Sequence, residues 1–98
     1  LNIILEPEQV ELLAKLVEAQ RSVPRETRHI FITAGPTMGD SSTQIMHDAF
    51  SENLRVYGGD LEVLADQGLL RRELQSGGRN YNYDVTPLGY KYYDEIIT

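Results

Sequence analysis

The chain contains no cysteine and no tryptophan, and it is poor in positive charge. Nine Lys and Arg stand against 15 Asp and Glu in 98 residues, for a net charge of −6 at pH 7. The absence of cysteine excludes disulfides, thiolate catalysis and cysteine-ligated zinc. The excess of acid argues against nonspecific binding of polyanions, because neutralising phosphates requires clustered Lys and Arg. No apolar run approaches the roughly 20 residues of a membrane helix, so we expect no membrane association.

What remains is ordinary for a globular domain, with 41% hydrophobic and 24% charged residues. The length predicts one domain over residues 1–98. The opening segment Leu1–Leu5 lacks an initiator Met and a basic region, so it is not typical of a secretory signal. We interpret it as a short strand or the end of a preceding element in a fragment of a longer protein. The cytoplasm is the predicted location.

Motifs for catalysis, metals or cofactors are also missing. The segment from Gly35 to Thr43 superficially resembles a phosphate loop, but three residues separate its glycines and no Lys follows them. His29 and His47 are too few for a catalytic zinc, which needs three protein ligands. No G-x-S-x-G elbow supports a hydrolase. We therefore expect a protein that is not an enzyme and carries no cofactor or metal.

Periodicity predicts the elements of the first half. Pro7 suits the first position of a helix, and apolar residues at i, i+3, i+4 and i+7 continue it to about Arg21. The run from Ile30 to Thr33 is typical of a short buried strand. Ser41 and Gln44 have the spacing of a capping box, and they predict a further helix. That helix would carry its apolar side chains on one face: Ile45, Met46, Ala49 and Phe50.

In the second half of the chain, the residues that begin and end each element are easier to identify. A helix is predicted from about Tyr57 to Gln67, and Gly68 supplies the left-handed residue that ends it. Two strands then flank a hairpin loop of Ser, Gly and Asn. Thr86 caps a final helix that begins at Pro87. The predicted strands are 69–75 and 81–85, and the loop is 76–80.

Two helices, a two-stranded ribbon and a closing helix make the layout of a winged helix-turn-helix domain. The segment Asp60–Leu70 resembles the end of the second helix entering the first wing strand. The segment Tyr83–Tyr90 resembles the return from the wing into a closing helix. About 40 of the 98 residues carry the resemblance. It implies an α+β, mainly α fold: a three-helix core with a short strand, a two-stranded wing and a C-terminal helix.

The resemblance implies a DNA-binding, transcription-regulatory module in which the second helix enters the major groove of double-stranded DNA. That helix, however, carries three carboxylates and no Lys or Arg, which favours the alternative of a protein–protein interaction or dimerisation domain. A wing-led contact with DNA would use arginines, with hydroxyls donating to phosphates. The candidate nucleic-acid-binding residues are Ser42, Thr43, Arg55, Tyr57, Arg71, Arg72 and Arg79.

The six tyrosines leave further alternatives open. Five lie between Tyr81 and Tyr93, where core and rim packing, stacking on bases and self-association would all use aromatic rings. A homodimer or partner protein would contact the first helix, Leu1–Leu5 and the final helix. A small-molecule pocket beside the tyrosine-rich hairpin is a third possibility.

Overall fold

A computed structural model of the chain describes residues 3–35, 42–78 and 80–98. Three helices, two further helical turns and five strands follow one another along these residues. In chain order they are α1 (Pro7–Arg21), η1 (Arg25–Thr27), β1 (Phe31–Ala34), β2 (Ser42–Met46), β3 (Leu54–Tyr57), α2 (Gly58–Asp66), β4 (Leu70–Leu74), β5 (Tyr81–Val85), α3 (Pro87–Tyr92) and the π-helical turn η2 (Tyr93–Ile97).

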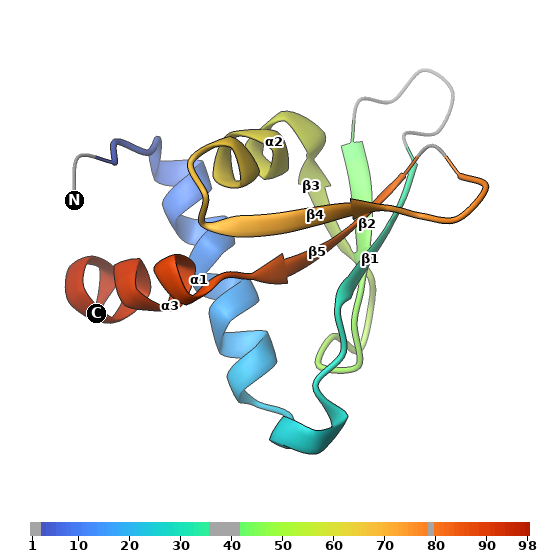
Figure 1. The fold of residues 1–98 in the computed structure, drawn as a ribbon, viewed down its shortest axis with the longest axis horizontal. Coiled ribbons are helices and arrows are strands. Elements are labelled where there is room, and N and C mark those ends of the chain that lie inside the picture. The colour runs from blue at the N-terminus through green and yellow to red at the C-terminus, as the bar shows by residue number, and fades with distance from the viewer. Residues whose placement is uncertain (1–2, 36–41, 79) are drawn as a thin grey trace.

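The strands form one antiparallel sheet in the order β3-β2-β1-β5-β4. The helices gather on one side of this sheet, to the left in Figure 1. Antiparallel sheets commonly pack one face on a core and leave the other in water. The register fixes which side chains share a face, because paired residues point the same way and neighbours along a strand alternate.

The prediction of a mainly α winged helix is wrong. Of the described residues, 43% are helical and 26% lie in strands, and the sheet has five strands instead of a lone strand beside a two-stranded wing. The difference arises between residues 42 and 57. A helix that reaches Phe50 was predicted in the first part of this stretch, but the chain forms the antiparallel pair β2 and β3.

Tertiary pairing decides the structure of this segment. A short apolar run satisfies both the helical and the strand pattern, so periodicity alone does not separate them. Ile45 is fully buried among the core residues, whereas the flanking Gln44 and Met46 are only half-buried. Gln44 therefore does not cap a helix; its Oε1 accepts from Asn53 Nδ2 at 3.2 Å across the β2–β3 connection. Ser41 lies outside the described residues.

Elements with strong end signals were predicted correctly. Helix α1 begins at Pro7, where the Glu6 N–H donates to Gln9 Oε1 at 2.9 Å, and it ends at Arg21 as predicted. Helix α2 and strands β4 and β5 lie within about a residue of their predicted bounds. The expected strand at the start of the chain is wrong in its described part, since Ile3 to Leu5 join no sheet.

The core lies between α1, α2 and the sheet. Its fully buried side chains come from all three: Leu13, Leu16 and Val17 from α1, Leu61 and Leu64 from α2, and Phe31 and Ile45 from the sheet. Tyr83, Val85 and Tyr92 close the side nearest α3. The apolar face of α1 is therefore buried in the core.

A tight junction joins α2, β4 and α3. Gly68 has a φ of 80°, a left-handed conformation that glycine adopts without strain. Its carbonyl accepts from Thr86 Oγ1 at 2.6 Å, and the same hydroxyl caps α3 by accepting from Gly89 N at 3.0 Å. The Thr86 N–H donates to the Leu69 carbonyl at 3.1 Å. The cap thus also anchors α3 to the α2–β4 turn.

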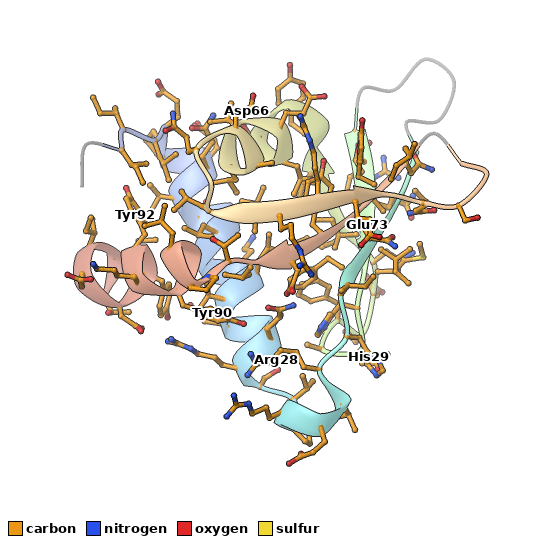
Figure 2. The ribbon with its side chains drawn as sticks, viewed as in Figure 1. Arg28, His29, Asp66, Glu73, Tyr90 and Tyr92 are labelled. Atoms are coloured by element: carbon orange, nitrogen blue, oxygen red, sulfur yellow. The ribbon has the colours of Figure 1, made fainter. Side chains whose placement is uncertain are left out.

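A buried polar network ties the C-terminal end of α1 to the sheet. The Gln20 side chain is fully buried, and its Nε2 donates to Asp84 Oδ1 at 2.9 Å and to the His29 carbonyl at 3.3 Å. Its Oε1 accepts from the Tyr90 hydroxyl at 2.6 Å. Arg28 Nη1 donates to the same hydroxyl at 3.2 Å, and Figure 2 shows Arg28 and Tyr90 at this end of the molecule.

Candidate interaction surface

The face of the sheet opposite the helices is covered by no described helix or strand, except beside Asp84, which the Gln20 side chain of α1 reaches. Ile32 pairs with Met46 on one side and with Asn82 on the other, and Asn82 pairs with Glu73. Ala34 pairs with Gln44, which pairs with Arg55. We call these positions, together with their alternating neighbours on the same face, the open face. Its strand residues are Ile32, Ala34, Ser42, Gln44, Met46, Arg55, Tyr57, Arg71, Glu73, Asn82 and Asp84.

The middle of the open face is apolar. Ile32 is 43% exposed, and Ile30, which precedes β1, is 40% exposed. With Met46 they line a hollow of about 250 Å³, whose other walls are His29, His47 and Asp48. Large aliphatic side chains that are exposed together at the centre of a sheet indicate an interaction surface, whereas isolated ones do not.

Charges of both signs flank the apolar centre. Arg55 lies on edge strand β3, Arg71 and Glu73 lie on edge strand β4, and Asp84 lies on β5. Glu73 is visible near the edge of the sheet in Figure 2. The strand residues of the open face therefore carry two arginines and two carboxylates, with no net charge, on a chain whose total is −6.

The structure divides the predicted nucleic-acid residues between two faces. The register puts Ser42, Arg55, Tyr57 and Arg71 on the open face. Thr43 and Arg72 point to the helix side, because they alternate with those residues along β2 and β4. Arg79 lies outside the described residues.

The arginines of β4 have carboxylate partners. Arg71 Nη2 lies 3.6 Å from Asp84 Oδ2, and Arg72 Nη2 lies 3.6 Å from Asp66 Oδ1. The Arg72 guanidinium also covers the Tyr81 ring, 5.3 Å from its centroid. Asp66 belongs to α2, the helix that the resemblance would place in a DNA groove. Internal pairing with acid lowers the positive potential that these arginines would present to phosphates.

A smaller hollow, of about 140 Å³, lies on the helix side beside the tyrosine-rich hairpin. Thr33, Glu62, Tyr81 and Tyr83 are among its walls. The Thr33 hydroxyl donates to the Tyr81 carbonyl at 2.6 Å, so it already serves the sheet. Burial raises the pKa of the Tyr83 hydroxyl, and the nearby Arg72 opposes this effect. Tyr83 thus acts as packing, as one of the alternatives from the sequence expected.

His47 closes the end of the large hollow through two hydrogen bonds. Its Nδ1 accepts from the Ala49 N–H at 3.0 Å, which places the ring proton on Nε2, 3.0 Å from the His29 carbonyl. The ring also lies against Phe31, with centroids 4.6 Å apart. Burial lowers the pKa of His47, against the opposing effects of the His29 hydrogen bond and the Asp48 charge. This geometry requires the neutral imidazole.

Sequence reasoning missed the open face as a candidate surface. A signal was present, since Ile30 and Ile32 alternate with Phe31 and give both faces of one strand large apolar side chains. The run was interpreted only as a short buried strand. Only the arrangement of the helices shows which face is left uncovered (Figure 1).

Comparisons with known proteins add no relative: no family model, no curated protein and no solved structure matches the chain. Over the described residues, no group of three or more His, Asp or Glu side chains is arranged to hold a metal ion. None of the helices in that part of the chain has the length and apolar character needed to cross a membrane.

Proposed function

We propose that this domain is a self-association module, in which two copies pack through their open faces. The observation that carries the proposal is the uncovered apolar centre of the sheet, flanked by balanced charge. The hydrophobic gain from covering Ile30, Ile32 and Met46 drives association. The proposal keeps the protein–protein alternative of the sequence analysis and moves its contact surface from the helices to the sheet.

The occupant that the charges favour is a second copy of this chain. Two molecules of charge −6 repel each other over most of their surfaces, but the open face has no net charge on its strands. A two-fold axis through the middle of the face brings Ile32 of each copy together, as an isologous interface requires. Sheets that pack face to face lie about 10 Å apart, a distance that aliphatic side chains fill.

Sedimentation equilibrium on Ile32→Lys tests the proposal. The side chain is exposed in the monomer, so a lysine there keeps the fold but places a buried charge at the centre of the dimer. We expect the natural chain to show a concentration-dependent dimer and Ile32→Lys to remain monomeric. Ile4→Lys is the matched control, because Ile4 is 86% exposed and lies away from the sheet.

Two results would contradict self-association through this face. One is a natural chain that stays monomeric at every concentration reached. The other is a control variant that weakens the dimer as much as Ile32→Lys does. Circular dichroism of both variants checks that each has folded.

DNA binding and a cytoplasmic location stay predictions from the sequence. The ion pairs of Arg71 and Arg72 and the acidic side chains of α2 weaken the attraction of these elements for DNA phosphates. Fluorescence anisotropy with mixed-sequence duplex DNA, at low and at high salt, separates the two functions. Binding that falls with salt and with Arg72→Ala, by a chain that is monomeric, would favour the DNA module instead.

A further inference from the structure

We infer that the outer edge of β3 binds an extended, basic segment of a partner protein, which adds to the sheet as a sixth strand. Strand β3 ends the sheet, and no described strand pairs with its outer side. Alternate backbone N–H and C=O groups of an edge strand point outward and are available for pairing. Addition of an extended peptide to such an edge is a general mode of peptide recognition.

A groove lies beside β3, between this strand and α1. It measures about 150 Å³. An added strand beside β3 would run over the groove, with every second side chain directed into it. The groove therefore supplies the specificity that backbone pairing lacks.

The floor and the rim of the groove differ in chemistry. Leu54 and Val56 of β3 and Leu12 of α1 form an apolar floor. The register puts Leu54 and Val56 on the helix side of the sheet, opposite Ile45 and Thr43. Three carboxylates border this floor, from Glu8, Glu11 and Asp60.

Of the three carboxylates that border the groove, only that of Glu11 has an ion-pair partner among the described residues. Lys15 Nζ lies 3.5 Å from Glu11 Oε1. Asp60 Oδ1 accepts a hydrogen bond from Gln9 Nε2 at 3.4 Å, which leaves its charge in place. Arg55 also borders the groove, but the alternation along β3 directs its side chain to the open face.

A lysine or arginine side chain matches both parts of the groove. Its aliphatic stem covers apolar surface while its charged end stays in water or near acid. The excess of carboxylate over the whole chain adds a long-range attraction for a basic segment. The partner is therefore an extended segment that carries Lys or Arg at alternate positions.

The probe is a short, blocked, fluorescein-labelled peptide of alternating Lys and Val, and its binding is measured by anisotropy at low salt. The same peptide with Glu in place of Lys is the negative probe. Glu8→Gln/Glu11→Gln removes two rim carboxylates. The matched control Glu26→Gln/Glu95→Gln removes the same charge elsewhere, and like Glu11 its Glu95 has a lysine partner four residues away.

We expect the rim variant to bind the Lys-Val peptide about three- to tenfold more weakly than the natural chain, as two exposed ion pairs imply, and the control variant to bind it nearly unchanged. Hydrogen exchange should slow at the backbone amides of Leu54–Tyr57 when the peptide is present. Ile32→Lys should bind the peptide normally, because the groove lies away from the centre of the open face.

Three outcomes would overturn the inference. They are no binding of the Lys-Val peptide at low salt, equal losses in the rim and control variants, and binding without slower exchange in β3. Equal losses of affinity in the rim and control variants would show that the total charge of the chain alone attracts the peptide. None of these results tests the proposed dimer, because the dimer would form through the open face around Ile32 and the groove lies on the helix side of the sheet.

Discussion

Gly89→Ala is a sharp test of how α3 is joined to the rest of the fold. A Cβ at this position would lie 2.3 Å from the Leu69 carbonyl oxygen and 2.8 Å from Val85 Cγ1. Neither neighbour is the flexible end of a long side chain, so the helix itself must move. Movement of α3 stretches the bonds from Thr86 to Gly68, Leu69 and Gly89.

The expected loss of stability follows from three effects. Overpacking of a tight contact costs about 1–3 kcal/mol. Weakening of the Thr86 cap costs about 1 kcal/mol more. Alanine regains about 1 kcal/mol through its helix propensity. We therefore expect Gly89→Ala to lower the free energy of unfolding by about 1–3 kcal/mol, or Tm by roughly 4–24 °C in a domain of this size.

Urea unfolding followed by circular dichroism measures this change. The matched control is Gly78→Ala in the β4–β5 hairpin, where a Cβ would meet Gln75 Cβ at an ordinary 3.5 Å. Its effect should lie within about 0.5 kcal/mol of zero. If Gly89→Ala were as stable as the natural chain, the close contact of α3 with Leu69 would be refuted.

Three further predictions concern polar side chains that link the elements of the fold, each measured by urea unfolding. Because the pKa of His47 is lowered in the fold, the unfolded chain takes up its proton first, so stability should fall as pH drops below about 6.5. His47→Asn should reduce this dependence and His29→Asn should retain it. Gln20→Leu should cost about 2–4 kcal/mol, since it removes the three hydrogen bonds that the buried Gln20 side chain makes with Asp84, the His29 carbonyl and the Tyr90 hydroxyl, and an undiminished midpoint would contradict the network. Thr86→Ala should cost about 1 kcal/mol, and a neutral result would show that its hydroxyl does not cap α3.

The parts of the fold that the sequence predicted have local causes. Pro7 begins α1, Gly68 ends the α2 turn, and Thr86 with Pro87 begins α3. Each of these residues restricts its own backbone or satisfies a nearby one, so its effect can be inferred without the rest of the chain.

The part that was mispredicted has a nonlocal cause. The segment from Gln44 to Phe50 has apolar residues at spacings that suit a helix, but pairing with Leu54–Tyr57 and with β1 makes its first residues part of strand β2, which ends at Met46. The open face was missed for the same reason. Whether Ile32 faces water or a core depends on where the helices pack, and no residue near Ile32 encodes that.

The pairing of β1 with β5 has a consequence for how the chain folds. Strands β2 and β3 form one hairpin with β1, and β4 and β5 form another, each from residues close in sequence. The registers Phe31–Tyr83 and Ile32–Asn82 pair β1 with β5, strands that lie about 50 residues apart in the chain. Closing so long a loop has a high entropic cost, so this central seam should be the last part of the sheet to form. During synthesis, the first hairpin must therefore wait for β5 to leave the ribosome before the sheet is complete.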